Sequence, residues 1–284
     1  MITIVVNCYN SSKTIERTLL SLLNQSSLQF KCLIVDNKST DHTLKVIQPF
    51  LDRRDLFVLY SLDEHVSLSK ARDLALKQVN TEFFSFLDSD DIYLPNRIQT
   101  IGKFLKENPR IDLYITNGIE NRSFKKCAFY RSPVSLKYIL ENNRVFLGAL
   151  IFNSKLIPKL EFDNDFSLIE EYYMLVKLSK SISIVDMYID NSDVYWDVSF
   201  KSLTWKSLAN WSEEYSQMKL LLRESLDDSE LTQLDDKVLF FDLFKREPPE
   251  RELYRGNLRS VYLIRKYLGL QVFTFIYKAY RLLR

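Results

Sequence analysis

The N-terminal third of the chain alternates between short apolar runs and helix-like stretches, and this alternation most constrains the fold. Strands are expected near residues 2–6, 30–35, 56–61 and 82–87, and helices over 14–24, 43–51 and 69–79. Strands that alternate with helices of this length form parallel sheets with right-handed crossovers. The sequence therefore predicts an α/β fold with a mostly parallel central sheet flanked by helices.

The pattern is less regular after residue 95. Helices are expected over 99–107, 167–179, 205–222 and 228–243, and strands over 111–116 and 149–152. The pair Pro248 and Pro249 marks the clearest linker, at residues 246–249. We expect a catalytic domain over residues 1–204 and a helical extension over residues 205–284.

Three carboxylates, Asp88, Asp90 and Asp91, directly follow the apolar run that ends at Leu87. Crowded carboxylates repel one another unless a counter-charge is present, and oxygen ligands suit Mg²⁺ or Mn²⁺. Because Mg²⁺ usually bridges one or two carboxylates to substrate phosphates, the cluster indicates a site for a phosphorylated substrate. A capped turn built from the same aspartates is the structural alternative.

The predicted sheet brings this cluster together with two other polar segments. Parallel strands place residues 7–10, Asp36 and residues 88–91 at the same carboxyl edge, where open α/β sheets bind ligands. This convergence favours a functional site over a simple turn.

Composition excludes several classes of protein. The chain has only 5 glycines and contains neither a Gly-x-Gly-x-x-Gly nor a P-loop motif, which disfavours nucleotide dehydrogenases and P-loop enzymes. The two histidines, His42 and His65, are interpreted as surface residues rather than zinc ligands. The odd number of cysteines (Cys8, Cys32 and Cys127) is typical of buried thiols in a reducing compartment. With no signal-peptide pattern and no bilayer-spanning run, we expect a cytoplasmic protein.

The C-terminal segment has an uneven charge. After Glu252 it carries no acidic residue, while seven lysines and arginines are interleaved with aromatic and aliphatic residues. This composition favours a helix that lies on an anionic membrane surface. A helical hairpin docked on the domain, or on a second subunit, is the alternative.

Five segments, in this order along the chain, carry a resemblance to a known family: residues 4–10, 33–41, 67–73, 86–95 and 170–178. In these segments the sequence resembles glycosyltransferase family 2, whose members are inverting nucleotide-sugar transferases with the GT-A fold, here of the kind that builds bacterial surface polysaccharides. The resemblance covers about the first two hundred residues.

The resemblance implies a nucleoside diphosphate sugar, with UDP expected, as the donor. By position, Asp36 would accept a hydrogen bond from the uracil ring, and Asn7 to Asn10 would flank the base and ribose. The implied nucleotide-sugar site consists of Asn7, Tyr9, Asn10, Asp36, Arg72, Asp88 and Ser89. The implied metal is Mn²⁺ or Mg²⁺, with Asp90 as the principal ligand, Asp88 reaching the ribose or a metal-bound water, and Asp91 as an auxiliary ligand.

The resemblance also implies a catalytic base at the start of a late helix, where Glu170 and Glu171 lie. Taken alone, acids at that position complement the helix dipole. Glu171 aligns with the family's base, although the family more often has aspartate there, and Glu170 or Asp163 could substitute for it. In-line attack by an acceptor hydroxyl would invert the anomeric configuration.

The sequence also departs from the family pattern. Ser67 replaces a usual glycine, Asp73 a usual asparagine, and Asp41 follows Lys38 without a glycine turn. The family's histidine near the end of the catalytic region is absent from residues 195–199. Lys201 is interpreted as a surface lysine, and the indoles of Trp196 and Trp205 fit a sugar platform or a core equally well.

The predicted function is metal-dependent transfer of a sugar to a saccharide acceptor, expected to be lipid-linked, at the cytoplasmic face of the plasma membrane. No nucleic acid partner is expected, and pairing of two chains through residues 205–284 stays open. A catalytically silent scaffold with the same fold is the alternative. Nucleotidyl transfer is disfavoured because it would favour a glycine-rich loop at residues 7–12.

Overall fold

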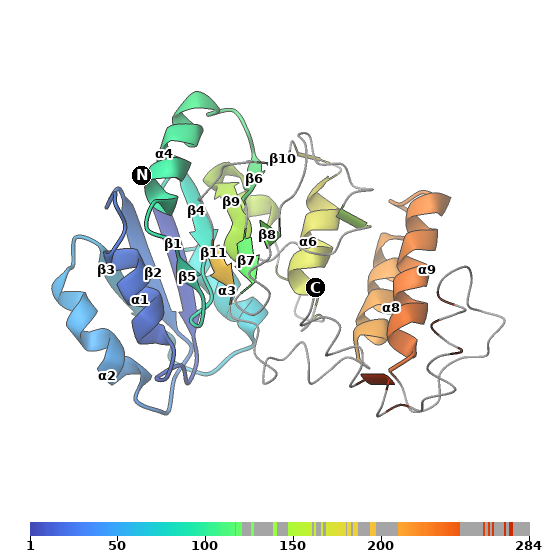
Figure 1. Ribbon diagram of the computed structural model, residues 1–284, viewed down its shortest axis with the longest axis horizontal. Coiled ribbons are helices and arrows are strands. Elements are labelled where there is room, and N and C mark those ends of the chain that lie inside the picture. Colours follow the sequence, from blue (N-terminus) through green and yellow to red (C-terminus); the bar gives the residue numbers. More distant parts are fainter. Residues whose placement is uncertain are drawn as a thin grey trace. The chain divides into compact units, whose positions relative to one another are not determined.

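Figure 1 shows a computed structural model of the chain. The structure describes residues 1–116, 118–120, 126–127, 139–140, 147–160, 162, 166, 169–179, 181–182, 184–186, 194–196 and 210–244, and a few single positions after 257. The chain divides into two compact units. Unit 1 comprises residues 1–139 and 144–197, and unit 2 comprises residues 140–143 and 198–284. The predicted boundary at residue 204 lies outside the described residues and stays a prediction.

Unit 1 is built on a seven-stranded sheet with the strand order β10-β6-β9-β4-β1-β2-β3. Its strands are β1 (Ile2–Cys8), β2 (Phe30–Asp36), β3 (Phe57–Ser61), β4 (Phe83–Phe86), β6 (Leu113–Ile115), β9 (Leu150–Asn153) and β10 (Ile184–Asp186). Every residue of β1 is buried, because β1 pairs in parallel with β2 on one side and with β4 on the other. The prediction of a mostly parallel sheet flanked by helices is confirmed.

One strand of this sheet runs against the others. β9 pairs antiparallel with both β4 and β6. A smaller sheet, with the order β5-β11-β7-β8, consists of β5 (Ile92–Tyr93), β7 (Gly118–Glu120), β8 (Lys126–Cys127) and β11 (Val194–Trp196). The sequence did not predict this second sheet, because strands of two or three residues are too short to show a period of two.

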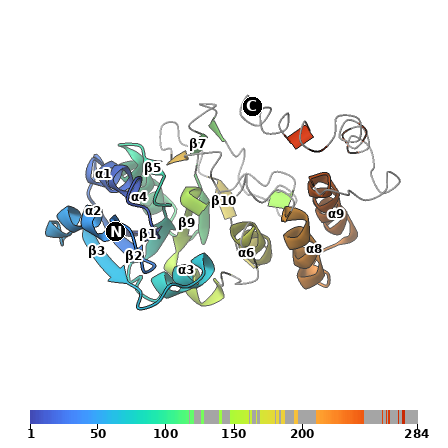
Figure 2. The same cartoon turned by 90° about the horizontal axis from the view of Figure 1, so that it is seen from below.

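Helices cover both faces of the central sheet. They are α1 (Ile15–Leu23), α2 (Thr43–Ile47), α3 (Leu68–Leu76), α4 (Arg97–Glu107) and α6 (Glu170–Ser179). Figure 2 shows α1 and α4 on one side of the sheet and α3 on the other. The helix expected over 43–51 ends early: after Ile47 the chain continues as a 3-10 helix, η1 (Gln48–Asp52), with Pro49 in its first turn. Proline has no backbone N–H for the α-helical ladder, which accounts for the change.

The core of unit 1 is rich in aromatic rings. Phe84 on β4 stacks on Phe152 of the antiparallel strand with ring centroids 5.0 Å apart, and Phe86 packs edge-on against Phe162 at 5.4 Å. Cys8 and Cys32 are buried free thiols in this sheet, as predicted, whereas the side chain of Cys127 is not described. These contacts fix β4, whose carboxyl end leads into the aspartate cluster.

In unit 2 the structure describes a helical pair, α8 (Trp211–Leu222) and α9 (Asp228–Asp242). α9 begins with a capping box in which Asp227 and Glu230 each accept the other's backbone N–H. Phe241 stacks on Trp211 and on Tyr215 at 5.0 and 5.7 Å, which holds the two helices together. Among the helices whose residues are described, none is long and apolar enough to span a bilayer. The predicted linker lies outside the described residues, and only a few single positions of the basic C-terminal segment are described.

Candidate functional site

The carboxyl ends of three neighbouring strands enclose a cavity of about 370 Å³. The register pairs Cys8 of β1 with Asp36 of β2, and the Leu87 N–H donates to the Val5 carbonyl at 2.9 Å. Residues after all three strands therefore meet at one edge, as the sequence predicted. The cavity is lined by Asn7, Cys8, Tyr9, Ser11, Asn37, His65, Val66, Ser67, Leu68, Ala71, Asp88, Ser89 and Asp90.

The loop after β1 is tied to the loop after β2. Asn10 has a φ of 50°, a left-handed conformation that asparagine tolerates better than most residues. Its side-chain oxygen accepts the backbone N–H groups of Thr40 and Asp41 at 2.8 and 3.2 Å, and its own N–H donates to the Ser39 hydroxyl. Asn10, predicted as a nucleotide contact, does not line the cavity, and its observed contacts shape the loops around it.

Tyr9 forms an aromatic pair that sequence reasoning missed. Its half-exposed ring stacks on the His65 imidazole with centroids 4.1 Å apart and planes 29° apart. His65 Nδ1 lies 3.1 Å from the Asn37 carbonyl oxygen, which can only accept, so Nδ1 donates. Although His65 is exposed, as expected for a surface histidine, its ring lines the cavity.

Asn37 clamps the segment that carries this histidine. Its side-chain amide donates to the Val66 carbonyl at 2.8 Å and accepts the Val66 N–H at 2.9 Å. The clamp explains how a residue outside any helix or strand is held at the cavity. The only sequence signal for Asn37 is its position directly after the strand that ends at Asp36.

Asp36 is buried beneath the cavity rather than in its lining. It is 1% exposed; one carboxylate oxygen accepts the Ser39 N–H at 3.1 Å, and the other lies 3.8 Å from Cys8 Sγ. Burial, together with the charge of Asp36, raises the pKa of the Cys8 thiol far above its usual range. Cys8 is therefore an unreactive neutral thiol, and the contact of Asp36 with uracil stays a prediction.

Two of the three clustered aspartates face the cavity. Asp88 (side chain 49% exposed) and Asp90 line it, together with Ser89, whose hydroxyl lies 2.8 Å from that of Ser11. Asp91 is buried outside the lining, and its N–H donates to the Asp88 carbonyl in a turn. Arg17 donates to the Asp90 carbonyl at 2.5 Å, which fixes the backbone of the cluster.

A divalent ion fits this arrangement only in the company of a ligand. In the part of the chain that the structure describes, no three histidine, cysteine, aspartate or glutamate side chains converge to hold a metal. Asp88 and Asp90 supply the one or two carboxylates that Mg²⁺ uses when substrate phosphates complete its shell. Asn7 adds a buried side-chain oxygen in the lining with no hydrogen-bond partner among the described residues.

Arg72 on α3 joins the aspartate cluster to the start of α6. Its side chain is 4% exposed and forms ion pairs with Glu170 at Nη1 and, at 3.4 Å, with Asp88 Oδ1 at Nη2. The guanidinium also lies 5.5 Å from the ring of Phe162, a favourable cation–π position. Arg72 thus contacts the aspartate cluster, and its predicted place near the nucleotide stays a prediction.

The two glutamates of α6 differ in accessibility. Glu170 is 4% exposed and is held by Arg72 and by the Ser69 hydroxyl. The Glu171 side chain is 29% exposed, with its carboxylate 4.0 Å from Arg72 Nη1. Only Glu171 therefore presents a carboxylate to solvent, while Glu170 is buried in a fixed network.

The residues that depart from the family pattern have structural partners here. The Ser67 hydroxyl caps α3 by accepting the Lys70 N–H, and Asp73 accepts the Phe162 N–H at 3.3 Å. Asp41 accepts hydrogen bonds from Thr43 and Ser12, which outweigh partial desolvation and hold its pKa well below the usual range. Asp163, Lys201, Trp205 and the side chain of Trp196 lie outside the described residues.

Comparison with known proteins gives a family match and several relatives. Residues 3–153 match the family described as Glycosyl transferase family 2. The chain is 26% identical over 185 residues to the UDP-Glc:alpha-D-GlcNAc-diphosphoundecaprenol beta-1,3-glucosyltransferase WfgD of Escherichia coli, covering 65% of this chain and 72% of WfgD. It is 28% identical to the poly(ribitol-phosphate) beta-N-acetylglucosaminyltransferase TarS of Staphylococcus aureus, over 52% of this chain and 28% of TarS.

Solved structures share the fold. A crystal structure of Staphylococcus aureus TarS 1-349 in complex with UDP-GlcNAc superposes with a TM-score of 0.68 at 19% identity, over 99% of this chain and 91% of that one. The mannosyltransferase PcManGT from Pyrobaculum calidifontis, in complex with GDP-Man and Mn²⁺, gives 0.61 at 17% identity, over 84% and 71%. The GT-A fold expected from the sequence is confirmed.

Proposed function

The chain belongs to glycosyl transferase family 2 and is a glycosyltransferase, and from this premise we propose that it transfers a sugar from a UDP-sugar to a saccharide hydroxyl with inversion. One observation carries the proposal: buried Arg72 contacts both Asp88 in the cavity lining and the acidic pair on α6. These contacts support a site in which the leaving-group side and the base side are close together.

Different residues of the cavity are assigned to the nucleobase and to the diphosphate of the donor. Tyr9 and His65 offer ring faces for a nucleobase, and the Asn37 clamp holds that end of the cavity in place. Asp88 and Asp90 line the same cavity, and we assign the diphosphate to them. A Mn²⁺ or Mg²⁺ ion held by Asp90 and Asp88 with the donor would neutralise charge on the departing diphosphate.

Glu171 is the proposed general base. Its accessible carboxylate accepts the proton of the acceptor hydroxyl while that oxygen attacks the anomeric carbon and the bond to the diphosphate breaks. Glu170 is a positioning residue, because the Arg72 and Ser69 contacts occupy its carboxylate. The Glu-for-Asp exchange at position 171 lengthens the base by one bond, and Arg72 lies near enough to steer its carboxylate.

The acceptor proposal comes from a relative. WfgD is named for a diphosphoundecaprenol-linked acceptor, so we propose a lipid-linked saccharide at the inner face of the plasma membrane, in surface polysaccharide assembly. The basic segment after Glu252 supports membrane contact. Pairing of chains through the C-terminal helices is a separate possibility, which sedimentation of the full chain would resolve.

The test is release of UDP from UDP-glucose and UDP-GlcNAc in the presence of Mn²⁺. Asp90→Asn should abolish release, because the proposed metal site loses its principal ligand, whereas Asp52→Asn, at an exposed position on η1, should not. Equal activity of the two variants would sink the metal role of Asp90.

A catalytically silent scaffold is the second candidate, favoured by the absence of a histidine from residues 195–199. Calorimetry with UDP and Mn²⁺ separates the two functions. A transferase must bind the nucleotide in a metal-dependent way, whereas a scaffold with a decayed cavity should bind neither UDP nor the metal.

A further inference from the structure

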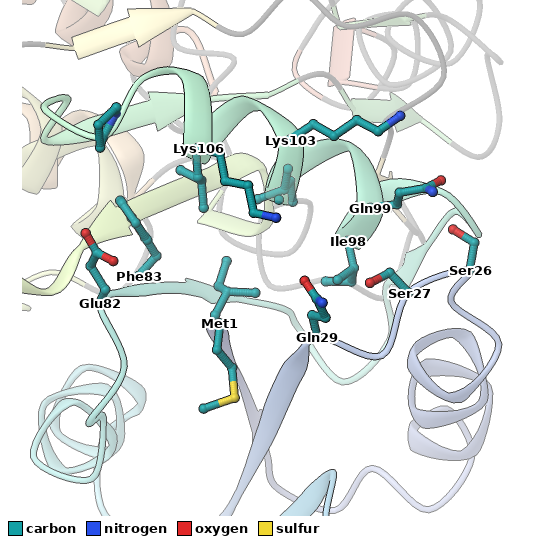
Figure 3. A pocket seen from close by; sticks show the side chains of 15 residues that line it. Met1, Ser26, Ser27, Gln29, Glu82, Phe83, Ile98, Gln99, Lys103 and Lys106 are labelled. Carbon is teal, nitrogen blue, oxygen red and sulfur yellow. The ribbon is translucent and has the colours of Figure 1, made fainter.

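A second cavity, of about 500 Å³, lies at the opposite, amino edge of the central sheet (Figure 3). It is bordered by the starts of β1 and β4, by the loop before β2, and by one face of α4. β1 has seven residues, so about 20 Å of strand separates the two edges. A ligand of this cavity is therefore not a reactant in sugar transfer.

The floor of the cavity is apolar and belongs to the core. Ile2 and Phe83 come from the sheet, and Ile98, Ile101 and Leu105 come from α4, and all five belong to the buried core. A volume of this size with an apolar floor and a few polar groups is typical of small-molecule sites.

Gly102 borders the cavity on the face of α4. It lies in the middle of α4, where glycine costs about 1 kcal/mol relative to alanine. A Cβ added at Gly102 would meet no heavy atom within 4 Å, so packing does not require glycine there. The lower helix propensity of glycine is therefore tolerated at a position that borders the cavity.

The rim of the cavity is positively charged. Lys103 and Lys106 lie one turn apart on α4, and neither forms an ion pair with any described residue. In Figure 3 the Lys103 side chain extends on the Gln99 side of the pocket, where Ser26 and Ser27 also lie, and Glu82 lies at the other end beside Phe83. The Lys106 side chain points over the middle of the pocket, above Met1, so both lysines lie away from the end that holds the one lining carboxylate.

We propose that this amino-edge pocket binds an anionic amphiphile, with its phosphate at the lysine and serine end and its apolar chain on the floor. Ammonium and hydroxyl groups are phosphate donors, and the buried aliphatic and aromatic floor suits a hydrocarbon chain. A membrane phospholipid and a soluble alkyl phosphate share this chemistry. The inference is independent of the donor cavity.

Two probes distinguish a membrane phospholipid from a soluble alkyl phosphate. Octyl phosphate, used below its micelle concentration, is titrated by calorimetry. Vesicles of phosphatidylcholine with and without phosphatidylglycerol are used in cosedimentation. The full chain is used throughout, so any contribution of the basic C-terminal segment is common to all variants.

Three variants test the site. Lys103→Gln/Lys106→Gln removes the charge, and we expect binding to weaken by roughly 30-fold, or about fivefold for each lysine near an anionic surface. Gly102→Leu fills the cavity without changing charge and should abolish octyl phosphate binding. Lys45→Gln/Lys77→Gln, which removes two exposed lysines elsewhere in unit 1, is the matched control and should bind as wild type.

Each outcome has a meaning. Octyl phosphate binding that is reduced in the first two variants only, together with vesicle cosedimentation that weakens in the same two variants, identifies a membrane lipid as the source. Octyl phosphate binding that is reduced in these variants while their vesicle cosedimentation equals that of the wild type identifies a soluble ligand. Equal losses in the two lysine pairs would reduce the effect to general surface charge and overturn the proposal. If Gly102→Leu fails to fold by circular dichroism, Gly102→Ala, which narrows the cavity less, replaces it and should weaken octyl phosphate binding. Unchanged binding in the folded cavity variant also overturns the proposal.

Discussion

The two edges of the central sheet carry cavities that differ in how their polar groups are held. At the carboxyl edge almost every polar side chain has a partner: Asn37 clamps Val66, His65 stacks on Tyr9, and Arg72 bridges Asp88 to α6. At the amino edge Lys103 and Lys106 pair with no described residue, and the floor is hydrocarbon. The first arrangement suits chemistry that needs fixed geometry, and the second suits binding that needs only charge and apolar area.

The largest effect is expected from removing the proposed base, Glu171, from the carboxyl edge. Glu171→Gln should lower kcat about 10²- to 10⁴-fold, because the amide cannot accept the acceptor's proton. UDP binding should be unchanged, since Glu171 does not line the donor cavity. Glu213→Gln, in the first turn of α8 of unit 2, is the matched control. A kcat for Glu171→Gln within about threefold of wild type would exclude Glu171 as the base.

Next in size is the stability that the Arg72 network supplies. Arg72→Met leaves buried Glu170 without its cation, which should cost about 3 to 5 kcal/mol of unfolding free energy. Urea denaturation measures the loss. Arg72→Met/Glu170→Met removes both charges and should recover part of the stability. A double variant less stable than Arg72→Met would show that the pair is not a unit.

The aromatic pair at the donor cavity gives a smaller effect. His65→Ala removes a ring stacked on Tyr9 and should weaken UDP binding by about two- to tenfold, the range for one aromatic contact. His42→Ala changes the chain's other histidine and is the control. Calorimetric dissociation constants that are equal for the two variants would contradict a role of His65 in donor binding.

The smallest effect belongs to the amino edge. Gly102→Ala should raise the unfolding free energy by about 1 kcal/mol, because alanine is the better helix former and its Cβ meets no atom. Thermal unfolding would register this as an increase of about 2 to 4 °C. A decrease in melting temperature would mean that glycine is required at this position for the fold itself.

The strand and helix alternation was sufficient to predict the parallel part of the sheet, because each of β1, β2, β3 and β4 reads as a short apolar run between helices. The direction of β9 was not predictable. Its residues Leu150–Asn153 are all buried, and a buried apolar run contains no information about which way it pairs.

The candidate site was predicted only in part. Asp88 and Asp90 follow a strand and line the cavity as expected. Asp91, which directly follows Asp90, is instead buried in the turn. His65 was missed because its contribution depends on a ring that is distant in sequence. Glu170 is buried and Glu171 is partly exposed because α6 packs against Arg72. Two adjacent glutamates look alike in the sequence, so this difference in exposure could not be predicted.

The burial of β1 has one more consequence. Ile2 at its start borders the amino-edge pocket, and Asn7 and Cys8 at its end border the donor cavity. A fully hydrogen-bonded strand between two parallel neighbours cannot shift at one end without breaking its ladder. Substitutions at the two ends should therefore act additively, and a lineage could exchange the ligand of one cavity while conserving that of the other.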